Sequence, residues 1–344
     1  MESVLHLFVG LAAACLWLPW AAAQQDVWLL SICSGDVKVG GLGNKSKPLV
    51  DLALSEINNR TDILNGYELK VEHVDSDCDP VEGSFRVTKA LKEGPPKVGI
   101  MGPCYSPVCE VVSPVARSYN LVIKAASCVI GEFSDEEKYP LFTRIFPPTG
   151  EMVVYAMVQL AGMFKWGRFT FVTQDIEICL LLAGGVHQTL AATFPNFDHV
   201  ATLLMATHDD AYNVVAELPS YRPRILVLSA YEDFAVNFFC ALYQAGMYGP
   251  SSNLVMLSPT HWWNSNFIEE LVMGASNIIG ISMAGRQPSD DPHGLSGRKI
   301  NDIMADYQTA CSVSTDGCHV GAGYFYDSVW SWAKVLDDWF LSGG

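Results

Sequence analysis

Two cysteines, Cys78 and Cys104, stand at matching places in the chain, because each follows a short apolar run. The runs are Leu69–Val74 and Val98–Met101, and each ends in a turn that holds the cysteine. The segment between them carries apolar residues at helical spacing. Strand, helix and strand in this order predict a βαβ unit with parallel, neighbouring strands. The pattern therefore predicts a Cys78–Cys104 disulfide at the carboxyl-terminal edge of a sheet, where open α/β sheets bind ligands.

The rest of the chain repeats this alternation of helix and apolar strand. Further strands are expected at Val27–Cys33, Leu121–Ser127 and Leu141–Phe146, and a helix at Pro48–Asn59 with proline at its start. A second series of helices and strands begins near Thr149. Two such series predict two α/β lobes, each with a doubly wound, mostly parallel sheet. We expect lobe 1 at residues 24–147, lobe 2 at 148–284, and a crossover and return to lobe 1 at 285–344.

Composition excludes some classes of partner. The chain has 344 residues, enough for two domains, and half of them are hydrophobic. Lys and Arg number 21 against 37 Asp and Glu, so the formal net charge is −16. That balance argues against nucleic acid and against an anionic membrane surface as partners.

The N-terminus has the character of a secretory signal. Residues 5–23 are apolar and end in three alanines, which favours a signal peptide at residues 1–23 and cleavage near Gln24. A signal anchor is the alternative. The final helical segment carries Asp327, Lys334 and Asp337, charges that a membrane-spanning helix would have to bury. We therefore expect no membrane anchor after the signal in this chain.

Cysteines and sequons agree with an exported protein. Cys15 lies in the signal, and the other nine cysteines are an odd number, so at least one is unpaired or bonded to another chain. Cys311 and Cys318 bracket a short loop and predict a second disulfide. Asn44 and Asn59 begin glycosylation sequons. The sequence leaves open the pairing of Cys33, Cys109, Cys128, Cys179 and Cys240.

Several motifs together resemble a known receptor family. The chain is similar to the extracellular Venus-flytrap domain of GABA-B-type, class C G-protein-coupled receptors, and more broadly to the type I periplasmic-binding-protein superfamily. The resemblance covers about Val27 to Phe340 and implies a small amino-acid-like ligand in a cleft between two lobes, and a dimer with a related receptor subunit. The motifs are LNGYELKVEHVDSDCDP, GPCYS, FKWGRFTFV, LSAYEDFAVNFFCALYQAGMYGP and YDSVW.

The resemblance also implies four ligand contacts. The family's carboxylate-binding serine corresponds to Ser106 and its second serine to Ser127, while its lobe-two tyrosine and tryptophan correspond to Tyr231 and Trp262. A hydroxyl at a helix N-terminus suits a carboxylate. The alternatives are that Ser106 only caps a helix beginning at Pro107, and that the two aromatic residues are ordinary interface residues.

Three other family positions are changed. The family's first-lobe tryptophan falls at Gly40, its histidine at Phe146 and its amine-pairing acid near Gly321. GABA itself is then expected to bind weakly or not at all, and a non-binding partner subunit is an open alternative. Carboxylates that could replace the missing acid are Asp36, Glu232 and Asp233.

An enzyme is not expected. No G-x-S-x-G, GxxxxGK[ST] or HExxH motif occurs, and GGLG at residues 40–43 lacks the rest of a dinucleotide fingerprint. We expect no cofactor and no metal. The rival hypotheses are a receptor guanylyl cyclase ectodomain and a secreted small-molecule-binding protein, and the chain is either a truncated receptor or a complete secreted relative.

Overall fold

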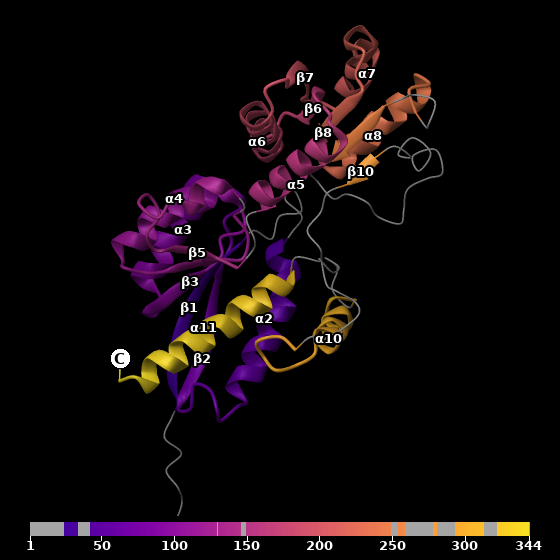
Figure 1. Cartoon of the computed structure of the whole chain (residues 1–344). Coiled ribbons are helices and arrows are strands. Elements are labelled where there is room, and N and C mark those ends of the chain that lie inside the picture. Colours follow the sequence, from indigo (N-terminus) through magenta and orange to yellow (C-terminus); the bar gives the residue numbers. More distant parts are fainter. Residues whose placement is uncertain are drawn as a thin grey trace, which may run out of the picture. The chain divides into compact units, whose positions relative to one another are not determined.

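The computed structural model describes residues 24–33, 42–128, 130–145, 149–248, 254–258, 278–280, 293–312 and 322–343. The chain forms two compact units, Met1–Ala126 with His293–Gly344, and Ser127–Pro292. One five-stranded sheet belongs to each series of strands (Figure 1). The alternating helices and parallel strand pairs confirm the predicted fold class. The lobe boundaries at residues 147 and 284 stay predictions.

The first sheet has the strand order β2-β1-β3-β4-β5, and β2, β1, β3 and β4 pair with one another in parallel. The edge strand β5 belongs to this sheet although its residues fall within the second unit's range. The strands are β1 (Gln25–Ile32), β2 (Tyr67–Val74), β3 (Lys97–Met101), β4 (Ile123–Ala125) and β5 (Phe142–Arg144). The helices of this unit are α2 (Leu42–Asn58), α3 (Pro80–Glu93), α4 (Ser106–Ser118), α10 (Ile300–Ser312) and α11 (Gly323–Leu341).

Helix α2 starts earlier than the sequence predicts. Pro48 lies inside the helix and not at its first position. The helical turn before Pro48 is stabilised by Ser46, which is buried and donates its hydroxyl to the Gly43 carbonyl at 3.0 Å. Helix α11 packs against α2 and β3 in the same unit. At Gly99 of β3 a Cβ atom would stand 2.2 Å from the Trp332 ring, so only glycine allows α11 to lie this close.

The strand order corrects the predicted disulfide. Strands β2 and β3 are parallel, but they are not neighbours, because β1 pairs with both of them. The residue after β1 is Cys33, and it bonds to Cys104 after β3 with a Cα–Cα distance of 5.1 Å. The predicted Cys78–Cys104 bond is therefore wrong: β1 separates the ends of β2 and β3, and its own cysteine lies nearer.

Gly102 allows β3 to end beside β1. Its φ is +92°, in the region that favours glycine, and a Cβ atom there would lie 2.5 Å from the Ile32 carbonyl oxygen. The Gly102 amide also donates to the Lys124 carbonyl of β4 at 3.2 Å. This close approach brings Cys104 to Cys33 and sets the point from which α4 starts.

The second sheet has the order β10-β9-β8-β6-β7, and its neighbouring strands pair in parallel. Its core includes Phe169 and Phe171 of β6. The strands are β6 (Arg168–Gln174), β7 (Asp198–Met205), β8 (Ile225–Ser229), β9 (Val255–Ser258) and β10 (Ile278–Gly280). The helices are α5 (Thr149–Phe164), α6 (Glu177–Thr193), α7 (Asp210–Tyr221) and α8 (Glu232–Gln244). Among the described helices, none combines the length and the apolarity that crossing a membrane requires.

The first testable prediction concerns Cys33. Peptide mapping without reduction should recover a Cys33–Cys104 peptide pair. Because the bond links residues 71 apart, Cys33→Ser should lower the free energy of unfolding by about 4 kcal/mol on the loop-entropy model. Cys78→Ser is the matched control and should cost much less. Recovery of a Cys78–Cys104 peptide would contradict the order of β2, β1 and β3 in the sheet.

The second prediction concerns Gly102. Gly102→Ala should destabilise the protein by about 1–3 kcal/mol more than Gly246→Ala, measured by urea unfolding. Both glycines have positive φ, but around Gly246 no atom lies within 4 Å of an added Cβ. The difference between the two variants isolates the contact with Ile32. Equal losses would show that β3 does not depend on this close approach.

Candidate functional site

Each sheet has one topological switch point, where successive connections leave in opposite directions. In the first sheet the chain runs from β1 to β2 on one side and returns to β3 on the other. In the second sheet it runs from β6 to β7 and returns to β8. Open α/β sheets bind ligands at the carboxyl ends of strands at such points. The switch points are therefore the candidate sites, and each is described within its own unit.

At the first switch point, the Cys33–Cys104 disulfide joins the ends of β1 and β3, and Ser106 comes soon after as the first residue of α4. Tyr105 occupies the N-cap position, and no side-chain hydrogen bond caps this end of the helix. The capping role considered for Ser106 is thus absent. Its side chain is partly buried.

Few backbone donors are available at the start of α4. The amides of Val108 and Cys109 both donate to the Tyr105 carbonyl at 3.0 Å. Pro107 has no N–H. The helix end therefore offers the Ser106 hydroxyl and amide, with the positive end of the helix dipole behind them. This is a small donor set that suits one oxygen atom of an anion.

Ser127 follows β4, the neighbour of β3. The parallel register of Ile100 with Ile123 places the ends of both strands at the same edge of the sheet. The next residue, Cys128, is buried and disulfide-bonded to Cys109 of α4. That bond, which the sequence left open, fastens the Ser127 segment to the helix that begins with Ser106. A shared ligand site for Ser106 and Ser127 stays a prediction.

At the second switch point, Gln174 and Tyr231 meet. Gln174 ends β6, is 8% exposed, and accepts a hydrogen bond from the Tyr231 amide at 2.9 Å. Tyr231 is the N-cap residue of α8 and is 48% exposed. The glutamine fixes the backbone, so the aromatic side chain stays available at the edge. Sequence reasoning missed Gln174, although a polar residue ending the apolar run FTFVTQ was a usable signal.

Acidic residues gather on this same carboxyl-terminal edge of the second sheet. Asp175 follows β6 and is exposed. Asp233 lies in the first turn of α8 and its carboxylate contacts the His208 ring at 3.1 Å. Asp210, the first residue of α7, accepts hydrogen bonds from the Thr207 and Ala206 amides in the turn before the helix, which lowers the pKa of its carboxyl group. The edge therefore carries negative charge at neutral pH.

Several predicted positions lie outside the described residues. These are Trp262, Asp36, Gly40, Phe146 and Gly321, and the signal segment 1–23; the side chain of Glu232 is also outside.

The remaining predicted sites are partly visible. Cys311 is disulfide-bonded, whereas Cys318 lies outside the described residues, so that pairing stays a prediction. Asn44 and Asn59 are both exposed. Glycosylation of either asparagine stays a prediction.

Among the described residues, no group of three or more His, Cys, Asp or Glu could hold a metal ion. Burial raises the pKa of the Cys179 thiol to about 12, so this thiol stays protonated and is a poor nucleophile. The site offers binding groups: a hydroxyl at a helix end, an aromatic ring and carboxylates.

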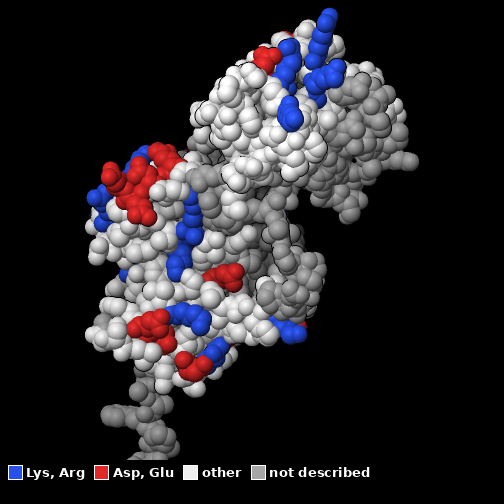
Figure 2. Space-filling view, in the orientation of Figure 1, with Lys and Arg blue, Asp and Glu red and all other residues white. Residues whose placement is uncertain are grey.

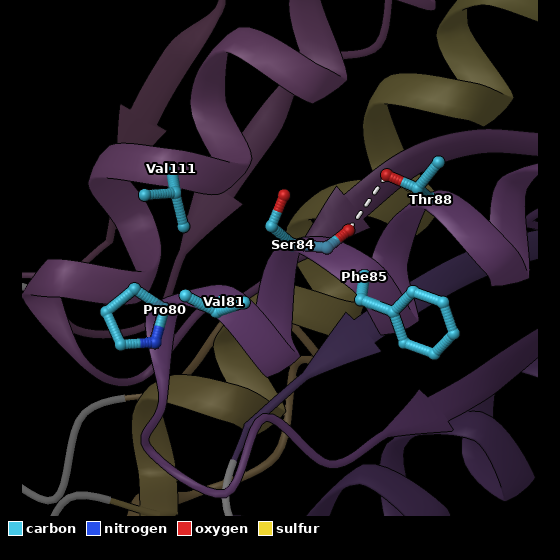
Figure 3. Close-up of a pocket in the computed structure, with 6 residues that line it drawn as sticks. All are labelled: Pro80, Val81, Ser84, Phe85, Thr88 and Val111. Carbon is cyan, nitrogen blue, oxygen red and sulfur yellow. Dashed lines mark hydrogen bonds between the residues drawn. The ribbon is translucent and has the colours of Figure 1, made fainter.

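A shallow apolar surface lies on helices α3 and α4. Its lining residues come from both helices, and Thr88 donates its hydroxyl to the Ser84 carbonyl at 2.8 Å (Figure 3). Val81 is 78% exposed and Phe85 61% exposed. We call this the α3–α4 surface, defined by Pro80, Val81, Ser84, Phe85, Thr88 and Val111.

Comparison with known proteins identifies the family. A family model described as the receptor family ligand binding region matches residues 46–339. The chain is 24% identical to gamma-aminobutyric acid type B receptor subunit 2 of Rattus norvegicus over 314 residues, which are 88% of this chain and 32% of the relative. It is 27% identical to subunit 1 of Mus musculus over 207 residues, 60% of this chain and 21% of that protein.

A shorter match is to the resact receptor of Arbacia punctulata, 31% identical over 136 residues, 40% of this chain and 13% of the relative. The chain spans about a third of the length of the subunit 2 relative. The family model, by contrast, matches most of the chain, including Ser106 and Tyr231. The chain therefore belongs to the receptor family ligand-binding region, with a type I periplasmic-binding-protein-like fold and homology to GABA-B receptor subunits.

Proposed function

We propose that this chain is the ligand-binding module of a GABA-B-type, class C G-protein-coupled receptor and takes a small amino-acid-like ligand. The observation that carries the proposal is Ser106, which stands at the start of α4 directly after the first switch point. The relatives of this chain are named as receptor subunits. Unit closure around the ligand, which the resemblance implies, stays a prediction.

Ser106 would bind the ligand carboxylate. The hydroxyl and amide at the helix end can both donate to one carboxylate oxygen, and the helix dipole favours a negative group there. Ser127, fastened to α4 by the Cys109–Cys128 bond, offers a second hydroxyl in the same region. Tyr231 and Trp262 would supply apolar cover for the ligand chain.

The ammonium group of the ligand needs a different partner from the one that the GABA-B pattern supplies. Gly40, Phe146 and Gly321 stand where the resemblance places an aromatic residue, a histidine and an acid. Each lost hydrogen bond to a charged group is worth roughly 1.5–3 kcal/mol, so losing two of them should lower GABA affinity roughly 10²–10⁴-fold. Carboxylates on the second sheet's edge, Asp175 and Asp233, are the groups we propose for an amine.

Calorimetry with a panel of small amino acids that includes GABA tests this proposal. We expect GABA to bind weakly or undetectably. For a ligand that does bind, Ser106→Ala should weaken binding roughly ten- to a hundredfold, because one hydrogen bond to a charged group is removed. The matched control is Ser118→Ala, at the other end of α4, where the hydroxyl bonds only to the Val115 carbonyl. Tight GABA binding, or equal losses in both variants, would contradict the assignment.

We further propose that a related receptor subunit covers the α3–α4 surface. The relatives carry the names of two numbered subunits of one receptor type, which supports a heterodimer. Val81 and Phe85 are largely exposed and belong to one contiguous apolar surface, a feature typical of interaction sites. In such a dimer this chain either binds ligand itself or serves as the non-binding partner.

Analytical ultracentrifugation of the chain with a related subunit tests the α3–α4 surface. Val81→Ser with Phe85→Ser should weaken association at least about tenfold, because two large apolar side chains leave the interface. Val335→Ser with Trp339→Ser removes comparable exposed apolar groups from α11 and is the matched control. If both variants associate like the unmodified chain, the partner binds elsewhere.

A receptor guanylyl cyclase ectodomain and a secreted binding protein remain second candidates. The match to the resact receptor is the observation that keeps a different receptor class under consideration. The sequence encoded downstream separates the candidates: seven membrane spans, one span or a stop codon.

A further inference from the structure

Charge is strongly segregated across the second sheet. Between residues 149 and 258 the chain contains four Lys and Arg residues, and all of them lie at the amino-terminal edge of the sheet, where helices lead into strands. Of the acidic residues there, only Asp198 and Glu217 lie near this edge. Figure 2 shows blue side chains gathered at one end of this unit. The four cations are Lys165, Arg168, Arg222 and Arg224.

Two adjacent connections supply these cations. Phe169 of β6 pairs with Ile225 of β8, and neighbouring strands lie about 4.8 Å apart. Arg168 and Arg224 each come one residue before this pair, so their backbones are close neighbours. Arg168 is partly neutralised by Asp198, with an N–O distance of 2.9 Å. Among the described residues the other three cations make no ion pair, and all four are exposed.

Aromatic side chains stand among the cations. Phe164 is 52% exposed and stacks on Trp166 at 4.9 Å between ring centroids. Tyr243, where α8 ends at the same edge, is 39% exposed and contacts the Tyr248 ring in a tilted arrangement, with 4.8 Å between ring centroids. Met163 is 72% exposed. We call these aromatic residues and the four cations the basic rim.

We propose that the basic rim docks on a phospholipid bilayer surface. Guanidinium and ammonium groups bind the headgroup phosphates, and tryptophan, tyrosine and phenylalanine rings enter the interfacial layer. A sulfated polysaccharide would use the cations but not the exposed Met163 and Phe164. The net charge of −16 argues against an anionic surface for the chain as a whole, but at physiological salt a charge acts over about 8 Å, so the local rim decides. The inference is independent of which ligand binds at the switch points.

Co-sedimentation of the full chain with phosphatidylcholine vesicles that contain a minor fraction of phosphatidylserine tests the proposal at physiological ionic strength. We expect saturable binding that weakens at least about tenfold in Arg222→Asn with Arg224→Asn, because each cation near the surface contributes to affinity. Asparagine is chosen because Arg222 has φ +47°, which asparagine tolerates. Phe164→Ser should weaken binding without changing charge.

The matched control is Lys47→Asn with Arg117→Asn, which removes two exposed cations from the first unit. It should bind vesicles like the unmodified chain. Thermal unfolding of every variant verifies that it is folded. The proposal is overturned if the unmodified chain does not sediment with vesicles, if it binds heparin or an acidic peptide but no vesicles, or if the control loses as much binding as the rim variant.

Discussion

The central position of β1 in the first sheet determines how the first switch point is built. β1 pairs with β2 through eight residues and with β3 on its other side. Because its carboxyl end is flanked by both strands, it creates the switch point, and Cys33 can reach Cys104 there. Gly102 allows the end of β3 to lie close to Ile32 of β1. Helix α4 then starts at Ser106, three residues after Pro103. Ser106 is thereby presented at the sheet edge by backbone constraints that do not depend on any ligand.

The second sheet reaches a similar result with a side chain in place of a disulfide. β6 lies between β7 and β8, and Gln174 at its end holds the Tyr231 amide. Breaking this bond would leave the buried Gln174 side-chain oxygen without its hydrogen-bond donor, which costs free energy. The sheet also separates its charges, with carboxylates towards the carboxyl-terminal edge and cations towards the amino-terminal edge. One edge therefore suits an ammonium group and the other suits phosphate, although the two edges belong to one compact unit.

Periodicity predicted the strands and helices because it reflects burial, which local sequence records. Val98–Met101 has the pattern of a buried strand, and β3 has those residues. Strand order is different: adjacent strands in the chain need not pair, so Cys78 and Cys104 matched in position along the chain but were separated by β1. Proline favours the first position of a helix, so Pro48 alone predicts a helix start there. The helical turn before Pro48 depends instead on the hydrogen bond from Ser46 to Gly43.

The candidate site was predictable only in part. Ser106 and Tyr231 follow strand ends, and a strand end can be recognised in the sequence. Gln174 was missed because its importance comes from β6 and β8 being neighbours, a fact that a sequence separation of 57 residues hides. The Cys109–Cys128 bond was missed for the same reason, since it requires β3 and β4 to be adjacent.

The central claim is that the start of α4 holds the carboxylate of a small amino-acid-like ligand. The most direct measurement is a crystal structure of the chain grown with the amino acid that binds it in solution. We predict a ligand carboxylate oxygen within hydrogen-bonding distance of the Ser106 hydroxyl. A ligand whose carboxylate lies on other groups, with Ser106 facing solvent, would contradict the claim.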